Sequence, residues 1–237
     1  MQVYELYQAP CACSYLPHLE ASFKYFYIKQ CTKEFYNILL MRGWRRFGNY
    51  FFAPRCDGCS ACVSIRYDCV LFEFSKSQKR ILKNPIKLEI KKPHITQEHL
   101  ELYAKYHAKM SIKKGWSEKN CGVEGYYDSF VQGALDFGYE FDYYIENKLV
   151  GVALIDILDS CISAVYCYYD HDFSKYSIGT YSILKQIEIA KKYNIRYLYP
   201  GYLIYNHHSM GYKEKFKPFE VLTNMPDINE IPLWVKE

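Results

Sequence analysis

The first feature of this sequence that suggests chemistry is a group of five cysteines near its N-terminal end. Cys56, Cys59 and Cys62 follow a C-x-x-C-x-x-C pattern, and Cys11 and Cys13 precede them. Thiolates at this spacing can converge on one soft cation, and an upstream cysteine can complete a set of four ligands. The same pattern also fits an iron–sulfur cluster. We therefore predict a metal or cluster site at these five residues, with zinc, an iron–sulfur cluster and a metal-free thiol cluster as alternatives.

The other cysteines are scattered through apolar segments, where a free thiol is commonly buried as a small hydrophobic group. The start of the sequence has no basic region followed by an apolar run, so no secretory signal is expected. Clustered thiols without such a signal favour a reducing, cytoplasmic location. We expect core packing for the scattered set, Cys31, Cys69, Cys121, Cys161 and Cys167.

Composition narrows the class of protein. Half of the 237 residues are hydrophobic and 24% are charged, which excludes a disordered chain. The 26 tyrosines suit strands and wet or base-stacking surfaces, and the net charge of +4 permits a nucleic-acid partner without requiring one. No apolar run reaches the ~20 residues of a membrane helix, and nothing indicates a membrane or DNA partner. The sequence contains no P-loop, nucleophile elbow or H-E-x-x-H motif.

The elements that must position these residues can be predicted from periodicity. In the first half we expect a helix over residues 33–41 that ends at Gly43, a strand within residues 63–74, a basic helix or loop over 75–84, and a strand over 86–90. Thr96 is a suitable N-cap for the helix that follows. Prolines at 85 and 93 bracket the change of pattern. We therefore predict a Cys-rich α/β domain over residues 1–92 and a second domain over 93–237.

The second half predicts a defined order of elements. A helix is followed by a hairpin with a Glu-Asn-Lys turn, a third strand, a strong amphipathic helix over residues 177–194 and a fourth strand. This order is typical of the GCN5-related acyltransferase fold, an α+β architecture with a central, mostly antiparallel sheet flanked by helices. The loop before the strong helix keeps Gly179 but lacks the multi-glycine form expected for coenzyme A. A coenzyme A donor is therefore disfavoured.

Several sequence blocks resemble one known family. They are CSYLP at 13–17, GWRRFGNYFFAPRCDGCSACVSIRY at 43–67, SKSQKRILKN at 75–84, SAVYCYYD at 163–170, SIGTYSILKQIEIA at 177–190, YLYPGYLI at 197–204 and MGYKEKFKPFE at 210–220. In this order they resemble the aminoacyl-tRNA–protein transferases over nearly the whole chain. Arg55 stands where bacterial relatives often have histidine, and Cys11 is an addition to the simplest family pattern.

The resemblance implies an activity. Members of this length are similar to the bacterial aspartate/glutamate leucyltransferases, whereas longer relatives are arginyltransferases. The implied reaction moves leucine from Leu-tRNA to proteins whose N-terminal residue is Asp or Glu, and marks them for N-end rule degradation. Arginine from Arg-tRNA is the alternative donor. From another class, a non-enzymatic metal- or redox-sensing RNA-binding module would explain the cysteines and the basic segment.

The implied chemistry predicts the kinds of residue that the site needs. The donor is an activated ester, so no cofactor is required, and the acceptor α-amine has an ordinary pKa near ~7.7–8.0. The site must orient both substrates, stabilise an oxyanion, and hold an acidic side chain with cations. We assign catalytic roles to Tyr202, Lys213 and Glu188. We assign substrate binding to Arg45, Arg46, Arg66, Tyr181, Gln186 and Tyr212, and tRNA phosphate binding to Lys76, Lys79, Arg80 and Lys83.

Overall fold

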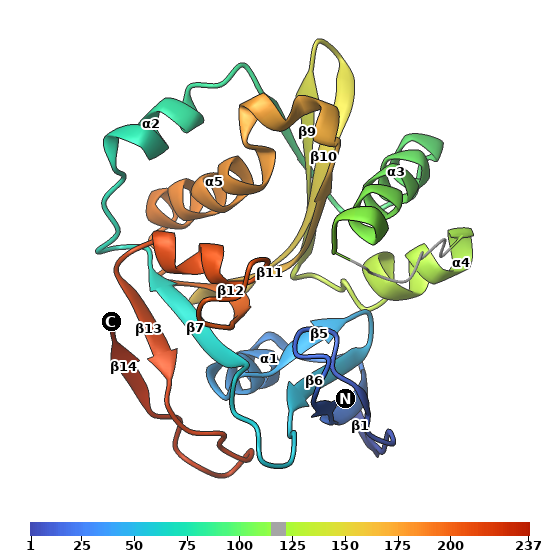
Figure 1. Cartoon of the computed structure of the whole chain (residues 1–237), viewed down its shortest axis with the longest axis vertical. Coiled ribbons are helices and arrows are strands. Elements are labelled where there is room, and N and C mark those ends of the chain that lie inside the picture. Colours follow the sequence, from blue (N-terminus) through green and yellow to red (C-terminus); the bar gives the residue numbers. More distant parts are fainter. Residues whose placement is uncertain (115–121) are drawn as a thin grey trace.

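Two antiparallel-rich sheets and their helices make up the molecule. The computed structural model describes residues 1–114 and 122–237. A large eight-stranded sheet carries helices on both faces, and a smaller four-stranded sheet lies beside one end of it (Figure 1). The predicted α+β class with a central, mostly antiparallel sheet is confirmed.

The large sheet contains strands from both ends of the chain. All of its neighbouring strands are antiparallel except β11 and β12, which are parallel. Its strand order is β14 (Trp234–Lys236), β13 (Phe219–Leu222), β7 (Val63–Asp68), β12 (Tyr197–Leu203), β11 (Cys161–Tyr169), β10 (Lys148–Ile157), β9 (Gly138–Ile145) and β8 (Lys87–Lys91).

The small sheet is entirely antiparallel. Its order is β1 (Gln2–Leu6), β4 (Phe23–Lys29), β6 (Tyr50–Pro54) and β5 (Arg45–Phe47), and a separate pair is formed by β2 (Cys11–Ala12) and β3 (Glu20–Ala21). The helices are α1 (Lys33–Met41), α2 (Lys76–Leu82), α3 (Gln97–Lys114), α4 (Gly122–Tyr126) and α5 (Ile178–Lys192). Shorter turns are the π-helical η1 (Tyr127–Val131) and the 3-10 helices η2 (His171–Tyr176) and η3 (Gly211–Lys215).

Helix α1 begins and ends where its sequence predicts. The Thr32 hydroxyl accepts a hydrogen bond from the Phe35 amide at 3.3 Å, which satisfies one free N–H of the first turn. Gly43 takes a left-handed φ of +81°, and the Trp44 amide then donates to the Leu39 carbonyl. This is the conformation that favours glycine just after a helix.

The β9–β10 hairpin also follows from local sequence. Glu146 and Asn147 both have positive φ, +49° and +62°, as a two-residue turn between right-twisted strands requires. Strand β10 is buried on both faces. Ala153 and Ile155 face the core under α5, whereas the alternate residue Val152 faces the core under α3. The predicted helix, three strands, helix and strand are confirmed as α3, β9–β11, α5 and β12.

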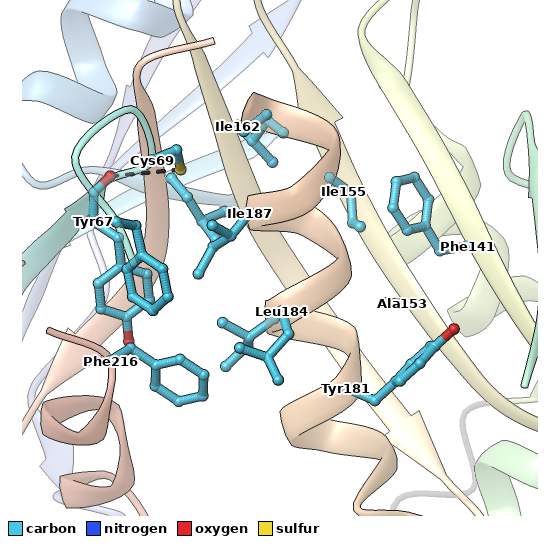
Figure 2. Packing of buried hydrophobic residues seen from close by; sticks show 14 of the residues in the cluster. Tyr67, Cys69, Phe141, Ala153, Ile155, Ile162, Tyr181, Leu184, Ile187 and Phe216 are labelled. Atoms are coloured by element: carbon cyan, nitrogen blue, oxygen red, sulfur yellow. Dashed lines mark hydrogen bonds between the residues drawn. The ribbon is translucent and has the colours of Figure 1, made fainter. Parts of the chain in front are cut away.

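Helix α5 packs against one face of the large sheet. Figure 2 shows Leu184 and Ile187 on the side of α5 that packs against Tyr67 and Phe216. All four side chains are almost fully buried, and burial of an aliphatic side chain of this size contributes about 1.5–3 kcal/mol. This packing joins β7 from the first half of the chain to a helix of the second half.

The strand predicted within residues 63–74 is shorter in the structure. Strand β7 ends at Asp68, whose carboxylate accepts hydrogen bonds from the amides of Val70 and Leu71 and turns the chain. Strands β7 and β8 both lie in the large sheet, and the division at residues 92 and 93 stays a prediction. None of the described helices has the length and apolar character needed to cross a membrane.

Candidate functional site

The strongest candidate site lies where the two parallel strands of the large sheet separate. Strands β11 and β12 pair only over residues 161–163 and 197–199. Beyond this point each strand also has a register shift with its other neighbour. The pairing of β11 with β10 shifts between Leu154 and Ile155 of β10. The pairing of β12 with β7 shifts between Leu198 and Gly201 of β12. Such bulges end strand pairing and often occur beside active sites. We call the region between residues 164–166 and 199–202 the strand split.

Arg45 bridges the strand split. Its Nη2 atom donates to the carbonyl oxygen of Ala164 at 2.6 Å and to that of Tyr199 at 3.1 Å, one on each strand. The residue is 6% exposed, and its Nη1 atom is buried without a hydrogen-bond partner in the described chain. A guanidinium with an unused donor at this point can hold a developing negative charge.

Lys213 faces the same place from η3. Its Nζ atom donates a hydrogen bond to the Tyr202 carbonyl oxygen and lies 3.8 Å from the Met210 sulfur. Gly201 has a left-handed φ of +96°, and a Cβ there would lie 3.8 Å from Lys213 Nζ and 3.9 Å from Arg45 Nε. The glycine therefore lets the backbone of β12 pass close to both cations.

The charge state of Lys213 is unusual. Burial, and next the Arg45 guanidinium, lower its pKa from 10.5 to about 7; Lys114 also lowers this pKa, whereas the Cys62 thiolate would raise it. No carboxylate lies within ion-pair distance of either Lys213 or Arg45 in residues 1–114 and 122–237. An amine with a pKa near 7 is neutral in a large fraction of molecules at physiological pH and can accept a proton.

An open pocket adjoins this site through Tyr202. It has a volume of about 310 Å³, and it contains two arginines, Arg42 and Arg55, beside the hydroxyl groups of Ser64 and Thr223. The buried Ser64 oxygen has no hydrogen-bond partner among the described residues. Two arginines beside the Ser64 hydroxyl form a suitable receptor for a carboxylate, whereas the Thr223 hydroxyl already donates to the Leu233 carbonyl oxygen at 3.0 Å.

Four of the five N-terminal cysteines gather beside the pocket. Cys62 lines it, and the pKa of the Cys62 thiol is raised to about 12, first by burial and then by the nearby Cys13, Cys56 and Cys59. Cys11 is exposed, and it contributes to the raised pKa of Tyr25, after burial, and not to that of Cys62. The donor set around Cys62 fits zinc or an iron–sulfur cluster in its chemistry, and the ligand set stays a prediction.

The scattered cysteines that the structure describes pack in or beside the core, as we expected for the whole set. Cys31, Cys69 and Cys161 are buried, and Cys167 is partly buried beside the α5 core. Cys121 lies outside the described residues.

The other two predicted arginines are committed to partners inside the protein. Arg46 makes a bidentate ion pair with the buried Asp156 of β10, and its remaining Nη1 donates to the Gly48 carbonyl oxygen. Arg66 pairs with Glu220 at 2.6 Å and its guanidinium stacks 3.8 Å from the Tyr197 ring centre. Of the three, only Arg45 lies in the strand split, and acceptor binding by Arg46 and Arg66 stays a prediction.

The remaining predicted catalytic residues, Tyr202 and Glu188, and the remaining predicted substrate-binding residues are dispersed. Tyr202 is in the site, but its hydroxyl donates to the Gly43 carbonyl oxygen at 2.9 Å. Tyr181 is buried in the core, where its hydroxyl donates to the Ile86 carbonyl oxygen. Gln186 is buried on α5, where its side-chain amide donates to the Ser182 hydroxyl. Tyr212 is 43% exposed next to Lys213. Glu188 is exposed on α5 and pairs with Lys185 at 2.6 Å, so the structure does not bring it to the strand split.

Three of the four predicted tRNA contacts lie on one short helix, and the fourth, Lys83, caps its C-terminal end. Helix α2 starts with a capping box in which Ser75 and Gln78 satisfy each other's backbone amides. The charged groups are exposed, and none has a carboxylate partner in the described part of the chain; they are Lys76, Lys79, Arg80 and Lys83. The arrangement leaves them free for phosphate contacts.

The fold and the strand split define the class of the protein. Over 83% of this chain and 68% of the other, the structure is similar to the crystal structure of FemX, with a TM-score of 0.50 and 10% sequence identity. The fold is therefore that of the GCN5-related acyltransferases, with a central, mostly antiparallel sheet flanked by helices.

Sequence comparison identifies the family. Residues 11–80 and 98–223 match the N-terminal and C-terminal parts of the family described as arginine-tRNA-protein transferase. The aspartate/glutamate leucyltransferase of Helicobacter hepaticus is 51% identical over 99% of this chain and 98% of that protein, and the one of Campylobacter jejuni is 43% identical over 94% and 95%. The chain belongs to the arginine-tRNA-protein transferase family, and the predicted family and enzyme class are confirmed.

Sequence reasoning missed two features of the site. It did not find that Arg42 and Arg55 share a pocket with Tyr202, because these residues are brought together by three separate segments. It also did not find Asp156 as the partner of Arg46. One signal was available, since an aspartate in the apolar run of β10 must be paired if it is buried.

Proposed function

We propose that this protein transfers leucine from Leu-tRNA to proteins whose N-terminal residue is Asp or Glu. The observation that carries the proposal is near-full-length similarity to proteins named aspartate/glutamate leucyltransferase, at up to 51% identity. The strand split supports it, because it offers the groups that attack of an amine on an ester needs. Cytoplasmic location, where aminoacyl-tRNA is made, belongs to the same proposal.

In the proposed reaction the acceptor α-amine attacks the ester carbonyl carbon of Leu-tRNA. The C–N bond forms, the bond from that carbon to the ribose oxygen breaks, and the tRNA leaves with a free hydroxyl. Neutral Lys213 takes the proton that the amine loses and returns it to the leaving oxygen. Removal of such a base typically costs about 10²–10⁴-fold in rate.

The oxygen of the tetrahedral intermediate needs a hydrogen-bond donor during this step. Arg45 supplies one, because its Nη1 is buried and has no hydrogen-bond partner in residues 1–114 and 122–237, while Nη2 is fixed to both strands. A donor that is already oriented costs no reorganisation when the negative charge develops.

The acidic side chain of the acceptor is assigned to the pocket beside Tyr202. Arg55 is held there by hydrogen bonds from its two Nη atoms to the carbonyl oxygens of Pro54 and Pro226, at 2.8 and 3.1 Å. Arg42 is held similarly by the Ile38 and Asp227 carbonyl oxygens. Two fixed guanidinium groups favour an N-terminal residue with a carboxylate.

A two-by-two transfer assay tests the proposal. Purified protein is given labelled Leu-tRNA or Arg-tRNA together with peptides that begin with Asp or Ala. We expect leucine on the Asp peptide alone. Transfer of arginine in its place would retain the reaction and change the donor, and no transfer from either tRNA by folded protein would refute the proposal.

A further inference from the structure

A second polar cluster, separate in the sequence from the cysteines, comes from the segment between β8 and α3, from the first turn of α3 and from strand β9. It consists of His94, His99, Glu140 and Asp142. One ligand atom from each residue lies within 4.8 Å of the others. The last three side chains are almost fully buried, whereas the side chain of His94 is 39% exposed. A small ion can therefore reach the cluster from the His94 side.

Glu140 is the decisive member of this cluster. It is fully buried on β9, and neither of its carboxylate oxygens accepts a hydrogen bond from the described residues. His94 Nδ1 lies 2.8 Å from Glu140 Oε1, yet the two atoms are not aligned for a hydrogen bond. A buried carboxylate without hydrogen bonds is costly unless a cation balances it.

His99 is oriented as a ligand would be. Its Nδ1 lies 2.5 Å from the Thr96 hydroxyl oxygen, which also accepts the His99 backbone amide. With Nδ1–H donating to Thr96, Nε2 is the nitrogen that faces Glu140 Oε1 at 3.3 Å and Asp142 Oδ1 at 3.4 Å, where a bound ion would replace the proton of its hydrogen bond to Asp142. A histidine whose second nitrogen is fixed by an oxygen is the usual arrangement around protein-bound metals.

The remaining charges also suit a divalent cation. Asp142 uses its other oxygen, Oδ2, to contact Lys91 at 3.3 Å, so Oδ1 is left to the centre of the cluster. Lys91 is shared with Glu89 at 2.8 Å. Glu140 has no lysine or arginine within ion-pair distance among the described residues, so a divalent ion at the centre of the cluster would offset its charge.

We propose that His94, His99, Glu140 and Asp142 form a binding site for a first-row divalent metal ion, foremost zinc. Two imidazole nitrogens and two carboxylate oxygens match the tetrahedral donor set of zinc. The ion links the segment before α3 to strand β9, and so fixes the N-terminal end of α3 on the large sheet. The site is separate from the cysteines around Cys62.

Metal content of the full-length protein tests this site. Metal-stripped protein is dialysed against Zn²⁺, and bound zinc is counted for the wild type, Glu140→Gln and His94→Gln, with His18→Gln as a control for exposed histidines. We expect each cluster variant to bind one equivalent less than the wild type, with affinity at that site weakened at least ~10–100-fold. The His18 variant is expected to bind as the wild type does.

Cobalt separates this site from the cysteines. The equivalent of Co²⁺ that Glu140→Gln loses should lack the thiolate charge-transfer absorption that cysteine ligands give. Because His94 is partly exposed, His94→Gln keeps the test decisive if Glu140→Gln does not fold. The proposal is overturned if a folded cluster variant binds as much zinc as the wild type, if His18→Gln loses the same equivalent, or if the lost cobalt carries the thiolate band.

Discussion

The lowered pKa of Lys213 predicts a stability signature that is independent of catalysis. The change is Lys213→Met, which keeps a flexible apolar stem and removes the amine. In the unfolded chain the amine has a pKa near 10.5, whereas in the folded protein burial and Arg45 lower it to about 7. Between these values the unfolded state binds more protons, so the free energy of unfolding of the wild type rises with pH.

The magnitude follows from the two pKa values. At pH 7 the unfolded amine is fully protonated and the folded amine is half protonated, and at pH 9 the unfolded amine is still mostly protonated. At 1.36 kcal/mol per pKa unit, this one group adds about 2 kcal/mol to the free energy of unfolding between pH 7 and pH 9. Lys213→Met removes this contribution, so its stability should rise by about 2 kcal/mol less than that of the wild type over the same interval.

Urea unfolding of both proteins at pH 7 and pH 9 measures this difference. The pH steps affect cysteines and tyrosines equally in both chains, so their contributions cancel in the comparison. Lys215→Met is the matched control, because Lys215 is exposed on the same turn. Equal stability changes in the wild type and Lys213→Met would refute the assignment of a buried, neutral amine, and with it the role of Lys213 as a base.

Three further predictions concern the arginines and the basic helix. Arg46→Ala should lower the free energy of unfolding by about 3–5 kcal/mol, because it leaves the buried Asp156 carboxylate without its partner. The double variant Arg46→Met with Asp156→Leu should recover most of this loss. Urea unfolding measures both variants, and an Arg46→Ala protein as stable as the wild type would contradict the ion pair. Arg45→Ala should lower kcat for transfer by about 10²–10³-fold with little change in KM for Leu-tRNA, measured by steady-state assay, and an unchanged kcat would remove Arg45 from the reaction. Lys79→Glu should weaken tRNA binding, and the slope of log binding constant against log salt concentration should become shallower by about 0.7–0.9 for each lost phosphate contact. The kcat at saturating tRNA should stay the same. Filter binding at several salt concentrations measures the slope, and an unchanged slope would exclude a phosphate contact at Lys79.

The elements of this fold are readable in the sequence where local signals agree. Helix α1 has a threonine cap, an apolar stripe and a terminal glycine, and it spans the predicted residues 33–41. The β9–β10 turn is specified by Asn147, a residue type that tolerates positive φ, between two strand-forming runs. In each case the determining contacts lie within a few residues of one another.

The site itself depends on contacts that local signals do not encode. Arg45 and Arg46 are adjacent and look equivalent in sequence, yet one bridges two strands and the other is neutralised by Asp156, 110 residues away. Because successive residues of a strand point to opposite faces, the pair had to separate, but nothing local indicates which face holds the site. Lys213 could be named from the sequence, whereas its burial and pKa required the tertiary structure.

The position of β7 has a consequence for how the protein is made. This strand lies between β12 and β13, and Tyr197, the first residue of β12, follows Asp68, the last residue of β7, by 129 residues (197 − 68). At about 5–20 residues per second of translation, roughly 6–26 s pass before a sheet partner for β7 is synthesised. Until then the nascent chain carries an unpaired strand with Ile65 and Tyr67, both of which end fully buried. Completion of the large sheet is therefore delayed until residues 197–237, about the last sixth of the chain, leave the ribosome, and nascent-chain stalling before residue 197 should leave this strand accessible to chaperones and proteases.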